Sequence, residues 1–296
     1  KEKINMSQFI GKTAVISGGA EGIGLSIAKA LAEEKMNIVL TDINEENLQK
    51  ASLELEATGV SVLPVLLDVA EEDQWEKVAE QAIARFGKIH MLVNNAGVGG
   101  DSGSIESQNK KGWQWVLDVN LMGVVYGAKV MVPLISQHGE GGWIVNVASM
   151  AGMGGVPYGG AYSATKAAVV ALSEGWAGEL QSKDINVSVL CPAFVQTRIY
   201  DSERNRPAQY KSDTKVIADE NSFFNRAKTM VESGIEVSIV GKRVVEALND
   251  GEFYIFTHPN YREVVQKRSS DIDAAFKKAS ESPLLQHIVN QKIEMF

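Results

Sequence analysis

The chain has 296 residues, of which 45% are hydrophobic and 22% charged, a composition that excludes extensive disorder and supplies enough apolar material for a core. Its 29 basic and 37 acidic side chains give a net charge of -8, which offers no large attraction to phosphate backbones, so we expect no nucleic-acid partner. The first residues lack the apolar segment of a secretory signal, and no apolar run approaches the roughly 18 residues that span a bilayer, so we expect no membrane association and a cytoplasmic location.

Short apolar runs alternate with helical patterns over most of the chain. The runs predict strands at 13–17, 37–41, 60–67, 90–94, 143–148, 185–190 and 253–256. The helical patterns cover 22–34, 45–57, 71–86, 113–136, 161–180 and 237–248. Several strands are apolar almost throughout, which is typical of parallel strands covered on both faces. With right-handed crossovers, this order predicts an α/β fold with a doubly wound parallel sheet.

The alternation breaks after Thr197. Residues 198–235 are polar, with scattered apolar groups and no clear strand, and we expect them to form a substrate lid. A helical extension is expected over 260–296. Since no linker separates these segments from the rest, we predict one domain spanning residues 1–296.

A glycine-rich turn, residues 17–24, lies between the first predicted strand and the first helix. Glycine is needed where the backbone turns sharply or approaches a ligand, and a helix N-terminus offers free N–H groups to a pyrophosphate. Gly18, Gly22 and Gly24 have the spacing GxxxGxG, with Ile23 inside the motif. We therefore expect these four residues to bind a dinucleotide.

Two acidic residues indicate which dinucleotide it is. Asp42 ends the second strand, 18 residues after Gly24, where a carboxylate can accept hydrogen bonds from the adenosine ribose and repel a 2′-phosphate. Glu21 adds a negative charge inside the glycine turn. Both favour NAD over NADP. The alternative for Asp42 is a cap on the following helix.

Tyr162 and Lys166 are four residues apart on a predicted helix, so they share one face. The ammonium is expected to lower the tyrosine pKa by about two to three units, or roughly 3 to 4 kcal/mol, which would make Tyr162 a general base or acid. A pair on a solvated helix face is the alternative. Ser149, at the carboxyl end of a strand, is placed to bind the substrate oxygen, and Asn120 is placed to hold a water beside Lys166.

With these motifs in this order along the chain, the sequence resembles the short-chain dehydrogenase/reductase family over about residues 11–256. The resemblance includes the 13-residue interval from Ser149 to Tyr162. The resemblance implies a Rossmann-type seven-stranded sheet of order 3-2-1-4-5-6-7, catalysis by Asn120, Ser149, Tyr162 and Lys166, and a homodimer or homotetramer. It implies that Asp68 and Val69 contact the adenine, that Asn95, Ala96 and Gly97 line the cofactor groove, and that Val195 and Thr197 lie at the nicotinamide, whose carboxamide Thr197 holds. Tyr162 and Lys166 would also contact the cofactor.

Three features depart from the family pattern. Ala193 follows Pro192 where glycine is usual, Ser17 stands where threonine is frequent, and the chain continues some 40 residues past the last strand.

The family leaves the substrate open. Apolar and aromatic candidates for its pocket are Met150, Met153, Tyr158, Phe194, Phe223, Phe224 and Met230. They favour a hydrophobic alcohol or ketone, and the wider pattern resembles members that act on aromatic or steroid-like secondary alcohols. Two other functions stay open, an NAD-binding redox sensor without turnover and an epimerase or dehydratase for nucleotide sugars.

Neither the cysteine nor the histidines predict a further reactive or metal-binding site. Cys191 lies in an apolar strand and is expected in the core. His90, His138, His258 and His287 have no spacing suited to a metal, so we expect no metal ligand among them.

Overall fold

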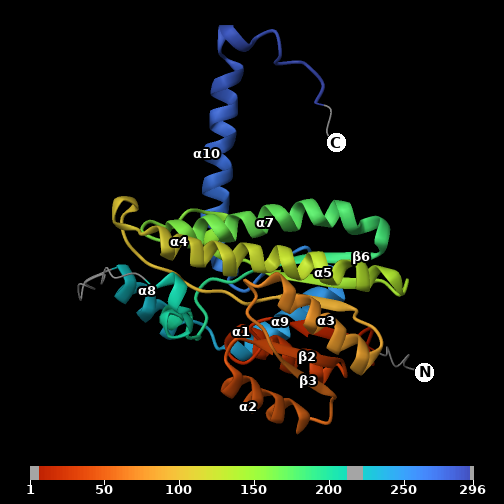
Figure 1. Ribbon diagram of the computed structural model, residues 1–296. Coiled ribbons are helices and arrows are strands. Elements are labelled where there is room, and N and C mark those ends of the chain that lie inside the picture. The colour runs from red at the N-terminus through yellow and green to blue at the C-terminus, as the bar shows by residue number, and fades with distance from the viewer. Residues whose placement is uncertain (1–6, 212–222, 294–296) are drawn as a thin grey trace. The chain divides into compact units, whose positions relative to one another are not determined.

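The computed structural model describes residues 7–211 and 223–293 (Figure 1). The chain forms two compact units, Lys1–Thr257 and His258–Phe296. The predicted division into one domain with a lid and an extension stays a prediction.

The first unit is built on a parallel sheet of seven strands. They are β1 (Thr13–Ile16), β2 (Asn37–Asp42), β3 (Val62–Leu66), β4 (Met91–Asn94), β5 (Gly142–Val147), β6 (Ile185–Cys191) and β7 (Tyr254–Phe256). Their order is β3-β2-β1-β4-β5-β6-β7, which confirms the predicted fold class and topology. Cys191 is fully buried at the end of β6, which confirms its place in the core.

Helices cover both faces of this sheet, as Figure 1 shows. They are α1 (Gly22–Glu33), α2 (Glu45–Glu56), α3 (Glu72–Phe86), α4 (Lys110–Leu117), α5 (Gly123–Gln137), α6 (Met150–Met153), α7 (Gly160–Leu180), α8 (Phe223–Glu232) and α9 (Val237–Asp250). One apolar cluster joins α1 and α9 to the sheet through Leu31 and Val244. The other joins α3 and α5 through Trp75 and Met131. Because β1, β4 and β5 are buried over their whole lengths, the apolar runs that predicted parallel strands have a direct structural cause.

The helix preceding β5 is longer and less regular than predicted. It runs from Lys110 to Gln137 as α4, a π-helical turn at Asp118–Met122, and α5. An 18-residue window within these 28 residues has a mean hydropathy of 1.5, which by length and composition is enough to cross a membrane, so the prediction that no apolar run approaches this length was wrong. Within the fold its apolar side chains include Val124, Met131 and Ile135, which are buried, as in a core helix of an α/β domain.

Strand β3 forms one edge of the sheet and contains Pro64. Leu67, just beyond β3, donates its N–H to Asp42 O of β2 at 3.0 Å. Successive backbone groups of a strand point to opposite sides, so the nitrogen of Pro64, three residues earlier, faces the free edge. Proline therefore leaves the ladder with β2 intact.

The polar segment after β6 is partly helical. Within its described residues, 3-10 turns occupy Ile199–Asn205 and Ala208–Tyr210, and α8 precedes a bridge between Val195 and Ile235. The predicted lid also includes residues 212–222, which lie outside the described residues.

The second unit contains α10 (Arg262–Ser280) and a 3-10 turn at Pro283–Leu285. It exposes large apolar side chains, among them Phe276 at 73% and Leu284 at 83%.

Candidate active site

A cleft opens at the carboxyl edge of the sheet, where parallel α/β folds bind ligands. Most of the predicted site residues line it. They are Gly18, Gly22, Ile23, Asp42, Asp68, Val69, Asn95, Ala96, Gly97, Ser149, Tyr162, Lys166, Val195 and Thr197. The other two predicted residues, Gly24 and Asn120, lie behind this lining.

The glycine turn has the geometry that a phosphate group needs. Gly18 and Gly22 have φ angles of +60° and +58°, a region that residues with a Cβ avoid. Gly24 permits close packing, because a Cβ there would lie 2.2 Å from Gly18 O. Helix α1 begins at Gly22, and no described side chain caps it. Its first N–H groups therefore remain available to an anion in the cleft, so these residues fit a dinucleotide pyrophosphate.

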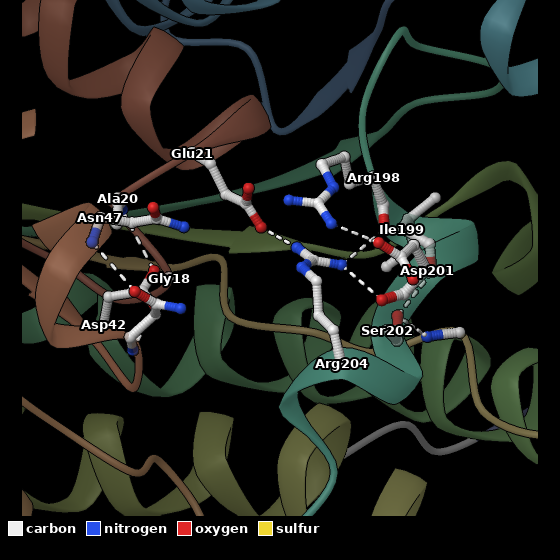
Figure 2. A network of polar contacts seen from close by, with 12 residues as sticks. Gly18, Ala20, Glu21, Asp42, Asn47, Arg198, Ile199, Asp201, Ser202 and Arg204 are labelled. Carbon is white, nitrogen blue, oxygen red and sulfur yellow. Dashed lines mark hydrogen bonds and ion pairs between the residues drawn. The ribbon is translucent and has the colours of Figure 1, made fainter.

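Asp42 links this turn to the end of β2 (Figure 2). One carboxylate oxygen accepts a hydrogen bond from Ala20 N at 3.1 Å and the other from Asn44 N at 2.9 Å. The cap on α2 is Asn44, which accepts from Asn47 N, so the alternative role of Asp42 as the cap was wrong. Burial raises the pKa of Asp42, while the backbone hydrogen bonds oppose that shift.

Asn95 connects the ends of β4 and β1. Its side-chain amide donates to Ser17 O at 2.9 Å and to Gly18 O at 2.8 Å. The Ser17 hydroxyl in turn accepts from Asn95 N at 3.0 Å. These bonds hold the glycine turn beside Ala96 and Gly97.

Ser149, Tyr162 and Lys166 meet on one wall of the cleft. Ser149 lies two residues beyond β5, as the N-cap of α6, and hydrogen-bonds the phenol of Tyr162. Lys166, one turn along α7 from Tyr162, is 4% exposed and donates from Nζ to Val147 O at 2.7 Å. Its Nζ lies 5.8 Å from the centre of the Tyr162 ring. The alternative of a solvated helix pair therefore does not describe these residues.

The ionisation of this group differs from the expectation. Burial raises the pKa of Tyr162, and the Ser149 hydrogen bond partly opposes that rise. Burial also lowers the pKa of Lys166 to about 8. The predicted fall in the tyrosine pKa was wrong, because desolvation of the phenol outweighs the ammonium, which is directed at a backbone carbonyl.

Asn120 lies in the π-helical turn and is fully buried. Its side chain accepts from Val98 N at 2.8 Å and donates to Val98 O at 2.9 Å. A Cβ built on Gly97 would lie 3.4 Å from both Asn120 Oδ1 and Lys166 Nζ, so these three residues converge behind the cleft. The side-chain amide thus fixes the loop after β4, and its predicted part in a proton relay stays a prediction.

The walls contain residues that sequence reasoning missed. Additional lining comes from Val98, Trp115, Val119, Arg204, Pro207, Tyr210 and Val231. By contrast, Met150, Met153, Tyr158, Phe194 and Met230 are not among the lining residues, and the side chains of Phe223 and Phe224 lie outside the described part. Trp115 and Val119 fall on the helix face next to Asn120, a spacing that could have indicated them.

Two histidines come together at the opposite edge of the sheet. His90, His138 and Glu140 place one potential ligand atom each within 4.8 Å of one another. However, His90 Nδ1 accepts from Thr13 N and its Nε2 contacts Glu140, while His138 Nε2 contacts Ile89 O and its Nδ1 accepts from Glu140 N. All four ring nitrogens already have hydrogen-bond partners.

Comparison with known proteins identifies the family. The profile of the short chain dehydrogenases matches residues 12–208. A CLA biosynthesis dehydrogenase/reductase of Lactiplantibacillus plantarum is 36% identical over 89% of this chain and 93% of its own. A 3-alpha-(or 20-beta)-hydroxysteroid dehydrogenase of Mycobacterium tuberculosis is 34% identical over 77% of this chain and 90% of its own. A solved short chain dehydrogenase/reductase from Burkholderia phymatum, in complex with NAD, is 36% identical, covers 90% of this chain and 96% of its own, and has a TM-score of 0.88.

The chain therefore belongs to the short chain dehydrogenase family, and it is an oxidoreductase by membership.

Proposed function

We propose that this protein transfers a hydride between NAD(H) and a secondary alcohol or ketone, with Tyr162 as the general acid and base. The observation that carries the proposal is the meeting of Ser149, Tyr162 and Lys166 on a cleft that also reaches the glycine turn and Asp42. NAD would accept the hydride during alcohol oxidation and, when reduced, return it to a ketone.

The chain's own residues would handle the proton. Because burial raises the pKa of Tyr162, its phenol is protonated at neutral pH and suited to donating a proton to a ketone oxygen. In alcohol oxidation it would accept that proton, and the rate is expected to rise with pH. The Ser149 hydroxyl would hydrogen-bond the same oxygen. Lys166, charged below its pKa of about 8, would favour the phenolate once the cleft excludes water.

The selection of NAD is assigned to Asp42. Its carboxylate lines the cleft and would repel the extra phosphate of NADP, whereas Glu21, which also lines the cleft, is paired with Arg204. The related short chain dehydrogenase/reductase from Burkholderia phymatum was solved with NAD.

The substrate is proposed to be hydrophobic, of aromatic or steroid-like type. Trp115, Val98 and Val119 give the cleft apolar wall beyond the catalytic residues. The similarity to a hydroxysteroid dehydrogenase supports the same class. Assembly as a homodimer or homotetramer and a cytoplasmic location stay predictions.

The proposal is tested by incubating the protein with NAD(H) and a panel of secondary alcohols and ketones, following absorbance of the reduced nicotinamide. Tyr162→Phe is expected to retain NADH binding and to lose kcat by about 10³-fold or more, because the proton donor is gone. Full activity in this variant would exclude the mechanism. NADH binding without turnover across the whole panel would favour a redox sensor, and turnover of nucleotide sugars without net NADH change would favour an epimerase.

A further inference from the structure

An ion pair between Glu21 and Arg204 joins the two walls of the cleft (Figure 2). Glu21 immediately precedes α1 in the glycine turn, and Arg204 belongs to the 3-10 segment Ile199–Asn205 after β6. Both residues line the cleft. Their side chains are 34% and 21% exposed, so the pair is partly shielded from solvent and stronger than an ion pair on an open surface.

Two backbone carbonyls close to Arg204 in the sequence hold its guanidinium in place. Its Nη1 donates to Arg198 O at 2.9 Å and to Asp201 O at 2.6 Å. These bonds leave Nη2 directed at the Glu21 carboxylate. An arginine oriented by two backbone carbonyls loses less conformational freedom on pairing than a free side chain.

The same segment is attached to a second wall of the cleft. The Ser202 hydroxyl accepts a hydrogen bond from Gly99 N, in the loop after β4, at 3.0 Å and donates to Ile199 O at 2.5 Å. The segment Ile199–Asn205 therefore bridges from the β4 loop to the glycine turn. Thr197, just before this segment, also lies close to the glycine turn, since a Cβ built on Gly22 would lie 3.5 Å from Thr197 Cγ2.

The charges at this contact matter for a bound dinucleotide. A pyrophosphate at the start of α1 would lie beside the Glu21 carboxylate, which by itself repels it. Arg204 offsets that charge. The other arginine of this wall, Arg198, has Asp201 as its own ion-pair partner.

We propose that the Glu21–Arg204 ion pair, here called the clasp, holds the segment Ile199–Asn205 closed over the bound nicotinamide cofactor and limits its rate of release. Arg204 is thus a positioning residue that acts through Glu21. The inference rests on the proposed function, since the molecule retained is the cofactor of that reaction.

The test is the dissociation rate of NADH from the whole protein. The complex is mixed with excess NAD in a stopped-flow instrument, and energy transfer from tryptophan to NADH is followed. Glu21→Gln and Arg204→Gln are each expected to speed release by about fivefold, and the double variant by no more than either single one, because each change breaks the same contact. Rising salt should speed release from the native protein and have little effect on the variants.

Two further variants make the result specific. Lys29→Gln breaks a pair with Glu54 of 2.6 Å between α1 and α2, away from the cleft, and should leave the rate unchanged. Arg204→Lys keeps the charge and should give an intermediate rate even if Arg204→Gln folds poorly.

The possible failures can be told apart. If the native protein does not bind NADH, the proposed function is wrong. If NADH binds and both glutamine variants release it at the native rate, the clasp is wrong while the function stands. If Arg204→Gln speeds release and Glu21→Gln slows it, Arg204 acts on the cofactor directly and the proposal is also overturned.

Discussion

Lys166 carries a large electrostatic cost within the active site. Its ammonium is 4% exposed and contacts a backbone carbonyl, with no carboxylate among its hydrogen bonds. The fall of its pKa from 10.5 to about 8 corresponds to about 3 kcal/mol against the charged form. Such a cost is typical of a group placed for chemistry rather than for stability.

The hydrogen bond from Ser149 to Tyr162 should be visible in the pH profile. Because this bond lowers the pKa of Tyr162, Ser149→Ala is expected to move the alkaline rise of alcohol oxidation to higher pH and to reduce kcat by about 10²-fold. The measurement is kcat/KM for oxidation from about pH 6 to about pH 10.

Ser163→Ala is the matched control for this change. Ser163 lies on the same helix as Tyr162, but its hydroxyl accepts from Val156 N, and it does not line the cleft. An unshifted profile in Ser149→Ala would contradict the role assigned to Ser149.

Asp42 allows a test of cofactor selection without dismantling the turn. Asp42→Asn removes the charge and keeps an oxygen that can accept from Ala20 N or Asn44 N. The ratio of kcat/KM for NADP to that for NAD is expected to rise by about tenfold, since one repulsive charge is lost. Asp68→Asn, at the other carboxylate predicted near the adenosine, should leave the ratio unchanged. If Asp42→Asn and Asp68→Asn had the same ratio of kcat/KM for NADP to that for NAD, the assignment of cofactor selection to Asp42 would be refuted.

At the scale of elements, two helix ends use the left-handed conformation with different residues. Lys35 follows α1 with a φ of +65°, and Met36 N donates to Leu31 O at 3.1 Å, as in a glycine-terminated helix. Gly251 ends α9 with a φ of +68°. Glycine suits this backbone conformation best, so the first helix end has an unfavourable residue, Lys35, and the second has the favourable one, Gly251.

Reciprocal substitutions at these ends should change stability in opposite directions. Lys35→Gly is expected to raise the free energy of unfolding by about 1 kcal/mol, and Gly251→Ala to lower it by about 1 kcal/mol. A Cβ on Gly251 would meet nothing within 4 Å, so the backbone angle alone decides the effect. Urea unfolding measures both, and a loss of stability in Lys35→Gly would show that the lysine side chain contributes more than its backbone costs.

The order of strands and helices could be predicted because each buried element has its own apolar pattern. The π-helical turn at Asn120 could not, because a helical pattern does not distinguish it from α-helix and the Asn120 side chain meets Val98 only in the tertiary fold. Helix α8 was missed inside a polar segment. The residues expected at the cleft came from motif positions, whereas Arg204 reaches Glu21 only through the tertiary fold.

At the scale of the whole molecule, the protonation of His90 makes the stability of the folded protein depend on pH. Its Nδ1 accepts from Thr13 N, so protonation would place a hydrogen against a donor, and burial lowers the pKa of His90 below its ordinary value of 6.5. The unfolded chain then binds more protons than the folded one, and stability is lost as pH falls through about 6.5. Glu140, whose pKa is lowered to about 2 chiefly by Lys88, adds a further loss below its ordinary pKa of 4.5.

His90→Asn should make this loss smaller. An asparagine oxygen can still accept from Thr13 N but does not titrate, so the free energy of unfolding is expected to fall less between about pH 7 and about pH 5 than in the native protein, even if it starts lower. His287→Asn, at an exposed histidine, should keep the native slope. A native slope in His90→Asn would assign the acid sensitivity to other groups.

The proline in β3 has a consequence for aggregation of the protein at high concentration. An edge strand with a full row of outward N–H groups is a template on which a strand of another molecule can add, and repeated addition leads to fibrous aggregates. Pro64 removes one donor from the middle of that row while keeping the inner row bonded to β2. A sheet assembled from almost entirely apolar strands is thereby protected at this margin against open-ended growth.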